Sequence, residues 1–365
     1  MISVAFDLRD PARSGIARVA CSLARALAAR LDIDPRLDLT LCGPVTQLEQ
    51  LGVRDWSRRA PRLVEWTSPR HSTAAQLTWP RVRRQAGDAI WFFPHWDVPW
   101  YALPRRYVAM VHDLILLRVP GATKPARRRL AERWIRRAVR HAGRVVVPSD
   151  YTARDLAALV PGSAAKIRRI PEGVDPGFFQ PAPPLSDDVA AFAAGGPFML
   201  SVGNRKRHKN LDMGVELLRR IPELRWIVVG EWYPDWEQVS AHAIDAGVAD
   251  RMLVLGAQQD DVLRALYHAA ACLFFPSRME GFGLPVVEAT ACGTPVVCSS
   301  AGSLLEAAGG CAALCHPDDA DAFVNAVRAV LARPARQPAA CVDRVRRMTW
   351  DASAERVMQV IEEIA

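Results

Sequence analysis

Short apolar runs alternate with helix-like stretches along this chain, and this alternation restricts the folds open to it. Residues 2–8 and 37–42 are apolar enough for buried strands, whereas residues 15–30 carry apolar side chains at helical spacing. Further short apolar runs follow at residues 89–93, 107–111 and 144–148. Such alternation favours βαβ units around a parallel sheet, so the sequence predicts an α/β fold.

A stretch rich in proline and glycine, residues 170–197, interrupts the pattern near the middle of the chain. A single core stops growing at about 250–300 residues, so a chain of 365 residues favours two domains. Beyond the interruption we predict strands at 198–203, 225–229, 252–255, 272–275 and 295–299, and helices at 318–333 and 352–364. The sequence therefore predicts two doubly wound, Rossmann-like domains that face each other across a cleft, at residues 1–180 and 181–345, and a terminal helix at 346–365 that packs back on the first domain.

The composition fits a globular protein that works with anionic partners. The net charge of +8 suits a membrane surface, nucleic acid or a phosphorylated substrate. No run of about 18 uncharged apolar residues occurs, so we expect no membrane-spanning helix. The first residues lack a basic segment followed by a long apolar stretch, so we expect no signal peptide and a cytoplasmic protein.

The spacing and surroundings of the eight cysteines predict free thiols. None of them forms a C-x-x-C pair, and most lie in apolar runs such as residues 271–274. We therefore expect buried thiols in a reducing compartment, with neither a disulfide framework nor a zinc site.

The most informative segment, residues 274–289, joins a predicted strand to a predicted helix through a loop that contains glycine. The helix is expected to begin near Leu284, with Pro285 in its first turn. Free amide groups and the helix dipole at that position favour an anion. Glu280 and Glu288 flank the predicted anion site. Because a phosphate repels a carboxylate, we expect both to accept hydrogen bonds from sugar or ribose hydroxyls.

A second connection from strand to helix, residues 202–211, carries a cluster of positive charge. Arg205, Lys206, Arg207 and Lys209 lie within five positions, and two of the four lysines of the chain are among them. A solvated basic loop is the plain explanation for such a charge run. This loop, however, joins a strand to a helix in the same way as the loop that carries Glu280. The match favours a site that neutralises a diphosphate.

These motifs and several others, in order along the chain, resemble retaining glycosyltransferases of family 4, which have the GT-B fold. Glu280 and Glu288, with Gly281, Phe282, Gly283, Leu284 and Pro285 between them, resemble the Glu-x7-Glu signature of that family. The resemblance spans nearly the whole chain. It includes Ser14-Gly15-Ile16-Ala17-Arg18, Val111-His112-Asp113-Leu114, Val147-Pro148-Ser149, Ile170-Pro171-Glu172-Gly173-Val174-Asp175, Val202-Gly203 with His208-Lys209-Asn210, and Ala291-Cys292-Gly293-Thr294-Pro295-Val296-Val297.

The resemblance implies a donor site in the second domain. Lys209 matches the lysine on the donor diphosphate, Glu280 the carboxylate at the donor sugar, and Glu288 the carboxylate on the nucleotide ribose. The family often has an arginine where this chain has Asn204, so either Arg205 or Lys206 is expected to supply a second positive charge. The loop residues Gly281, Phe282, Gly283 and Leu284 complete the implied donor site.

The first domain contributes two residues to the implied site. Gly15 matches a loop glycine that approaches the diphosphate, although a helix-capping glycine is its plain alternative. His112 matches the histidine near the transferred sugar. A lone histidine at the end of a strand is often structural, but Asp113 and the family match favour a function. His95 is open to both interpretations. Leu305 and the run Gly309-Gly310-Cys311 depart from the family pattern outside the donor residues.

No cofactor or metal is expected. Asp32 and Asp34 imitate a metal-binding Asp-x-Asp motif, but they precede Pro35 after a helix, so the sequence predicts a turn there. No cluster has metal-ligand spacing, and the cations of residues 205–209 already serve the phosphates.

The implied reaction moves a hexose, of mannose or rhamnose type, from a nucleotide-diphosphate sugar to a saccharide or lipid-linked acceptor in surface polysaccharide assembly. A GDP-sugar is the expected donor, and retention of configuration is implied by the resemblance. A nucleotide-sugar epimerase or another GT-B enzyme is the alternative. A dehydrogenase is disfavoured because no first βα turn shows G-x-G-x-x-G, and a non-enzymatic binding protein because Lys209, Glu280 and Glu288 are intact.

Residues 124–144 predict a basic amphipathic helix. They hold nine basic residues, while Leu130, Trp134, Ile135 and Ala138 are expected to face the sheet. The outer face is then strongly positive, which favours an anionic membrane surface over nucleic acid as partner. We therefore expect a peripheral protein on the inner face of the cell membrane.

Overall fold

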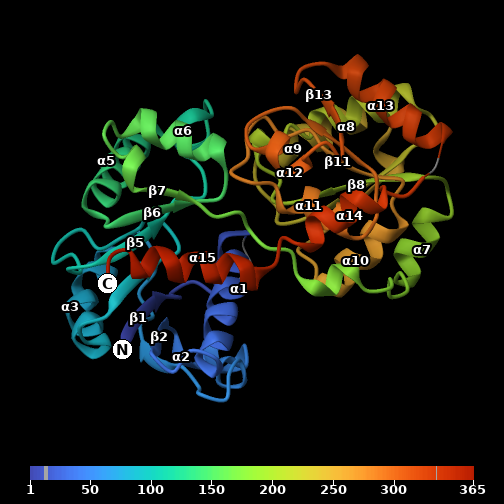
Figure 1. The fold of residues 1–365 in the computed structure, drawn as a ribbon. Helices are drawn as coiled ribbons and strands as arrows, with labels where there is room; N and C mark the ends of the chain where they lie inside the picture. The colour runs from blue at the N-terminus through green and yellow to red at the C-terminus, as the bar shows by residue number, and fades with distance from the viewer. Residues whose placement is uncertain (12–14, 334) are drawn as a thin grey trace. The chain divides into compact units, whose positions relative to one another are not determined.

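The computed structural model describes residues 1–11, 15–333 and 335–365. These residues form two compact units, which are coloured along the chain in Figure 1. Unit 1 contains Met1–Gly173 and Trp350–Ala365, and unit 2 contains Val174–Thr349. Unit 1 is thus built from two separate stretches of the chain.

The division between the units falls ahead of the predicted boundary at residue 180. Val174 donates a backbone hydrogen bond to the carbonyl of Met348, and the ring of Phe178 lies 5.9 Å from that of Tyr267. Both residues are buried in the core of unit 2. Because of these contacts, the segment that follows Gly173 packs as part of the second unit.

Unit 1 is built on a parallel sheet of seven strands in the order β3-β2-β1-β4-β5-β6-β7. The strands are β1 (Ile2–Asp7), β2 (Leu37–Gly43), β3 (Arg62–Glu65), β4 (Ile90–Phe93), β5 (Tyr107–Met110), β6 (Arg144–Val147) and β7 (Ile167–Arg169). The helices are α1 (Gly15–Ala29), α2 (Val45–Gln50), α3 (Thr73–Ala86), α4 (Ile115–Arg118), α5 (Pro125–His141), α6 (Asp150–Leu159) and α15 (Trp350–Glu362). The strand order reverses between β1 and β4.

The C-terminal helix α15 completes unit 1. It packs along α1, and the hydroxyl of Ser353 donates a hydrogen bond of 2.8 Å to the carbonyl of Pro171. At its end, the carboxylate of Glu363 accepts hydrogen bonds from Arg144 and Arg168. These contacts hold the last helix of the chain on the unit that contains the first strand.

Unit 2 repeats the architecture with a parallel sheet of six strands in the order β10-β9-β8-β11-β12-β13. The strands are β8 (Phe198–Val202), β9 (Arg225–Val229), β10 (Met252–Leu255), β11 (Cys272–Phe275), β12 (Val296–Ser299) and β13 (Ala313–Cys315). The helices are α7 (Asp187–Ala193), α8 (Asp212–Arg220), α9 (Trp236–Asp245), α10 (Asp260–Ala269), α11 (Leu284–Ala291), α12 (Leu304–Ala308), α13 (Ala320–Ala332) and α14 (Ala339–Arg346). Here the order reverses between β8 and β11.

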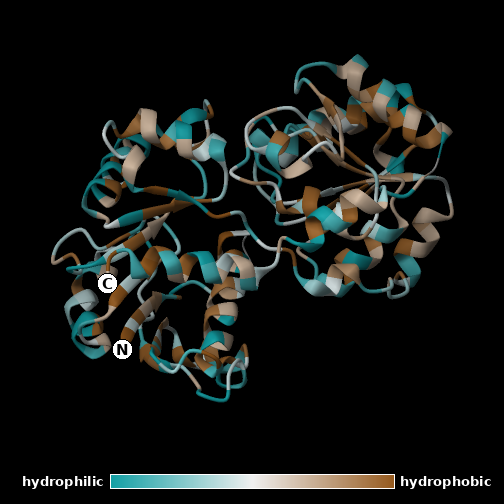
Figure 2. Ribbon diagram, viewed as in Figure 1, coloured by the Kyte–Doolittle hydropathy of each residue, from teal (hydrophilic) through white to brown (hydrophobic). Residues whose placement is uncertain are grey.

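The predicted doubly wound α/β fold is confirmed in both units. Central strands such as β4 and β11 are buried along their whole length, which is why their sequences are continuously apolar. Figure 2 shows apolar residues concentrated on the strands and polar residues on the outer helix surfaces. The sequence missed the edge strands β3, β7 and β13, because most of their residues are exposed or half-buried and carry no apolar run.

The expectation that every cysteine is a free thiol is wrong for one pair. Cys311 and Cys341 form a disulfide with their Cα atoms 5.7 Å apart. Cys311 follows α12 and Cys341 lies on α14, which is held beside α12 by hydrogen bonds from Arg344 to the carbonyls of Ala307 and Ala308. The two cysteines are 30 residues apart in sequence, so local spacing gave no signal for the bond.

The predicted buried face of helix α5 is confirmed for Ile135 and Ala138 and is wrong for Leu130. Its buried residues include Ala131, Ile135 and Ala138, whereas Leu130 is 51% exposed. Two of its arginines are engaged: Arg136 pairs with Glu132, and Arg137 donates to the carbonyl of Trp100. Among the residues that the structure describes, no helix is both long and apolar enough to cross a bilayer.

One prediction concerns the packing of α8 on the sheet of unit 2. A Cβ atom at Gly214 would lie 2.4 Å from the ring of Trp226. Alanine normally stabilises a helix by up to about 1 kcal/mol relative to glycine, but overpacking costs about 1–3 kcal/mol. We expect Gly214→Ala to lower the free energy of unfolding, measured in urea, whereas Gly256→Ala, with open space around it, should leave it unchanged. A more stable Gly214→Ala variant would contradict this packing.

Candidate active site

The candidate site of unit 2 lies at the carboxyl ends of β8 and β11. These strands are neighbours, and the strand order reverses between them. Ligands of open parallel sheets bind at such a reversal, because the connections on either side diverge and leave space. The predicted basic loop follows β8, and the predicted loop around Glu280 follows β11. The topology therefore brings the two predicted segments together.

An ion pair between Lys209 and Glu280 joins these two connections. The Lys209 Nζ atom lies 2.7 Å from Glu280 Oε1, and the two side chains are only 12% and 11% exposed. Burial raises the pKa of Glu280, but the charges of Lys209 and His208, together with hydrogen bonds from Lys209 and Ser277, hold that pKa below its usual value. The carboxylate of Glu280 is therefore charged, and the ion pair holds both side chains at the end of the sheet.

The backbone around Glu280 is held by its neighbours. The hydroxyl of Ser303 donates hydrogen bonds to the carbonyls of Glu280 and Phe282, at 2.9 and 3.0 Å. Gly283 has a φ of 109°, a left-handed conformation that disfavours side chains, and it leads directly into α11. The predicted loop residues Gly281, Phe282, Gly283 and Leu284 thus form a rigid connection that ends at the start of a helix.

The cations of the loop after β8 are not equivalent. The guanidinium of Arg205 donates to the carbonyls of Gly230 and Glu231 and lies over the ring of Trp236. The ammonium group of Lys206 lies 4.5 Å from the ring centre of Tyr233. The guanidinium of Arg205 is therefore bound to backbone carbonyls of its own unit. The ammonium group of Lys206 makes only an aromatic contact among the described residues.

A small depression lies beside Lys209. Its lining includes Gly203, Asn204, Lys209, Phe275 and Pro276. The side-chain oxygen of Asn204 is buried and has no hydrogen-bond partner within the described part of the chain. Buried polar atoms are nearly always paired, so this oxygen is available to a donor group on a ligand.

Glu288 lies deeper than expected. Its residue is 2% exposed on α11, and its Oε2 atom accepts a hydrogen bond of 2.9 Å from the hydroxyl of Tyr267. The sequence did not single out Tyr267, because this partner lies on α10 and no local pattern links the two positions. The ribose role of Glu288 stays a prediction.

The predicted residues of unit 1 are Gly15 and His112. Gly15 is the first residue of α1, and Ser14 before it lies outside the described residues. The His112 ring is buried and held from two sides: Nε2 donates to the carbonyl of Pro94 at 2.8 Å, and Nδ1 lies 3.3 Å from the carboxylate of Glu172. Glu172 belongs to a motif noted in the sequence, but its contact with His112 was missed.

Other predicted features lie away from these positions. Asp32 and Asp34 belong to a turn in which they accept hydrogen bonds from the backbone of Arg58 and Arg36, as expected for a local structural role. Within the described ranges, no group of three or more histidine, cysteine or acidic side chains is placed to hold a metal ion.

Comparison with known proteins identifies the family. Residues 13–178 match the model for Glycosyltransferase Family 4, and residues 186–348 match that for Glycosyl transferases group 1. A D-inositol 3-phosphate glycosyltransferase of Xylanimonas cellulosilytica is 31% identical over 72% of this chain and 68% of its own length. The chain is a family 4 glycosyltransferase. The predicted family and enzyme class are thereby confirmed.

Two further proteins resemble this glycosyltransferase. The O-antigen chain mannosyltransferase B of Escherichia coli is 28% identical over 73% of this chain and 70% of its own. The structure of the Anabaena protein HepE in complex with UDP and glucose superimposes with a TM-score of 0.78, at 17% identity, over 99% of this chain and 100% of that one. The GT-B fold of the glycosyltransferase is therefore confirmed.

The ion pair generates a prediction for catalysis. We expect Lys209→Ala to lower kcat/KM at least about 100-fold, because it removes a buried charge at the point where the leaving group must be stabilised. Arg54→Ala removes a positive charge from an exposed pair with Glu49 and should leave kcat/KM unchanged. The measurement is steady-state transfer from a nucleotide-sugar donor, with circular dichroism to show that both variants fold. Turnover close to wild type in Lys209→Ala would remove this residue from the site.

Proposed function

We propose that this glycosyltransferase moves a hexosyl group from a nucleotide-diphosphate sugar to a saccharide or lipid-linked acceptor, with retention of configuration. The observation that carries the proposal is the buried ion pair of Lys209 and Glu280 at the strand reversal of unit 2. Departure of a nucleoside diphosphate leaves negative charge on a phosphate oxygen. A fixed ammonium group and the dipole at the start of α11 stabilise such charge without reorganising.

In the proposed donor complex, the ammonium group of Lys209 stays beside Glu280 and donates a further hydrogen bond to the diphosphate. The carboxylate of Glu280 then accepts hydrogen bonds from hydroxyls of the transferred sugar. Lys206 supplies the second positive charge, because Arg205 is already bound to two backbone carbonyls. The buried oxygen of Asn204 accepts a hydrogen bond from the donor, which satisfies its missing contact.

The proposed chemistry needs no metal ion or other cofactor, since the cations of the loop and the helix start neutralise the diphosphate. The leaving phosphate itself takes the proton of the acceptor hydroxyl on the same face of the sugar, as the family resemblance implies. The resemblance matches His112 to the histidine near the transferred sugar, and Pro94 and Glu172 hold its ring from two sides. These hydrogen bonds support a positioning role for its imidazole ring.

For the donor we propose a GDP-sugar of mannose or rhamnose type. The support is the similarity to a relative named as an O-antigen chain mannosyltransferase. The same similarity supports a place in surface polysaccharide assembly, where acceptors are saccharides or lipid-linked.

A thermal-shift panel with GDP, UDP, dTDP and ADP in excess EDTA tests the donor site. We expect GDP to raise Tm most, because a ligand at 100 times its Kd stabilises its site by about 2.7 kcal/mol. The Lys209→Ala variant should lose the shift. A larger Tm shift with UDP than with GDP would show that the donor carries uracil and not guanine. Transfer that stops in EDTA and returns with Mg²⁺ or Mn²⁺ would overturn the metal-free mechanism.

We also propose that the enzyme binds the inner face of the cell membrane through α5. Arg127, Arg128, Arg129 and Arg133 are exposed there, and none of the four forms an ion pair with another described residue. Trp100 and Tyr101 are 41% and 44% exposed, and Arg137 of α5 donates to the carbonyl of Trp100. Basic residues near an anionic membrane contribute about 1 kcal/mol each, and aromatic side chains suit the interface.

Vesicle flotation tests this surface. We expect binding to vesicles that contain phosphatidylserine, no binding to pure phosphatidylcholine, and weaker binding as salt rises. Replacing Arg127, Arg128, Arg129 and Arg133 together by glutamine should abolish binding. A matched variant with glutamine at the exposed residues Arg58, Arg81, Arg84 and Arg105 removes the same charge elsewhere and should still bind. Equal loss in both variants would show only a dependence on net charge.

A further inference from the structure

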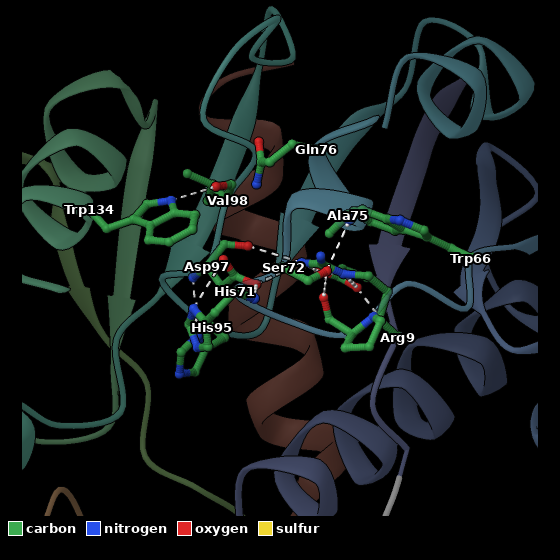
Figure 3. A network of polar contacts seen from close by, with 12 residues as sticks. Arg9, Trp66, His71, Ser72, Ala75, Gln76, His95, Asp97, Val98 and Trp134 are labelled. Atoms are coloured by element: carbon green, nitrogen blue, oxygen red, sulfur yellow. Dashed lines mark hydrogen bonds and ion pairs between the residues drawn. The ribbon is translucent and has the colours of Figure 1, made fainter. Parts of the chain in front are cut away.

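The sheet of unit 1 has a strand reversal of its own, between β1 and β4. Arg9 follows β1, His95 and Asp97 follow β4, and His71 lies on the connection after β3. Figure 3 shows these side chains converging at one end of the sheet. Ligands of parallel sheets bind at this kind of position, and neither Gly15 nor His112 accounts for this cluster.

Asp97 organises the cluster. Its carboxylate accepts a hydrogen bond of 2.9 Å from the backbone amide of His71, and its other oxygen lies 3.3 Å from Nδ1 of the same residue (Figure 3). Arg9 approaches the carboxylate at 3.4 Å and also pairs with Asp7 at 2.8 Å. Burial raises the pKa of Asp97, but the hydrogen bonds of His71 and the charge of Arg9 hold it below its usual value.

His71 is held in an unusual conformation. Its φ of +56° is uncommon for a residue with a side chain, and the contacts with Asp97 maintain it. The ring lies 4.7 Å from that of Trp96 and 5.7 Å from that of Trp134, and the side chain remains 33% exposed. Because Asp97 occupies Nδ1, Nε2 is the nitrogen left for a ligand.

Arg70 provides the clearest sign of a missing partner. Its Nε and Nη2 atoms are buried, and neither has a hydrogen-bond partner among the described residues. Arg70 as a whole is half-buried, but buried N–H groups without an acceptor are costly, so such groups normally face one. Burial, and then the charge of Arg70, hold the pKa of His95 well below its ordinary value. His95 is therefore neutral; its Nδ1 accepts from the amide of Asp97, which leaves the Nε2 hydrogen as a donor.

Aromatic side chains border these donors. The rings of Trp96 and His95 are 4.5 Å apart, and Trp134 packs against both Trp96 and the exposed Trp100. Aromatic surface that stays exposed next to polar groups is typical of ligand sites, because it packs against apolar faces such as those of sugar rings.

We propose that Arg70, His71, His95 and Trp96 form a binding site for a negatively charged saccharide, which serves as the acceptor. Arg70 and the two imidazoles hold a phosphate or carboxylate group, and Trp96 contacts the sugar ring. The proposal rests on the proposed function, since it names the acceptor class of the same enzyme. The charge can belong to the sugar itself or to the diphosphate of a lipid carrier.

Saturation-transfer NMR on the whole chain, without nucleotide, tests the site. The probes are mannose 6-phosphate and glucuronate, with mannose and glucose as their neutral counterparts. We expect the charged sugars to bind at least about ten-fold more tightly, which corresponds to about 1.4 kcal/mol. Arg70→Gln should remove this preference. Arg54→Gln, which removes an arginine from an exposed pair with Glu49, should retain it.

A second variant provides a test of the site that remains if Arg70→Gln does not fold. His71→Asn should also weaken binding of the charged sugars, and asparagine tolerates a left-handed backbone. A second arm uses phosphatidylcholine vesicles with and without a polyprenyl diphosphate-linked mannose. Binding in the vesicle arm alone assigns the charge to the lipid carrier, and binding of the soluble sugars assigns it to the sugar.

The result that overturns the proposal is the absence of any charge preference in both arms, or a preference that survives in folded Arg70→Gln and His71→Asn. Thermal shifts with nucleotides in the same protein report separately on the proposed function. Nucleotide binding without charged-sugar binding rejects the acceptor site alone. Charged-sugar binding without nucleotide binding rejects the donor site alone.

Discussion

The ion pair of Lys209 and Glu280 is the interaction around which the candidate active site is arranged. Two buried charges are stable only if each has its partner in good geometry, because removing them from water costs several kcal/mol per ion. Ser303 holds the backbone carbonyls of Glu280 and Phe282, which fixes the loop that carries the glutamate. Gly283 then directs the chain into α11. The charges are thus placed before any ligand arrives.

Both units have a salt bridge at the position where the strand order of the sheet reverses. In unit 2 a lysine and a glutamate span the strand reversal, and in unit 1 Arg9 and Asp97 do so. In each case the topology of a parallel sheet supplies the location, and a salt bridge fixes the two diverging connections. Among the described residues, both positions keep buried polar atoms without a hydrogen-bond partner, such as the amide oxygen of Asn204 in unit 2 and two guanidinium nitrogens of Arg70 in unit 1.

Much of this architecture was readable from the sequence. Central strands are buried on both faces and are therefore continuously apolar, and the loops of Lys209 and Glu280 were assigned to one site because each joins a strand to a helix. The ion pair between the two residues was not predicted. Contacts between distant segments left no local pattern. The bonds of Glu288 with Tyr267 and of His71 with Asp97, and the disulfide of Cys311, join residues whose proximity only the folded chain creates. Leu130 was wrongly assigned to the buried face of α5, because more than one face of this helix carries apolar residues at helical spacing.

The discontinuous composition of unit 1 has a consequence for its synthesis. Helix α15 covers α1, yet the ribosome makes the whole of unit 2 between them. At about 5–20 residues per second this interval lasts roughly ten to forty seconds. During that time the apolar side chains of α1, such as Val19 and Leu23, lack their final cover. The apolar face of α1 in the nascent chain is therefore without its partner helix until α15 has been made.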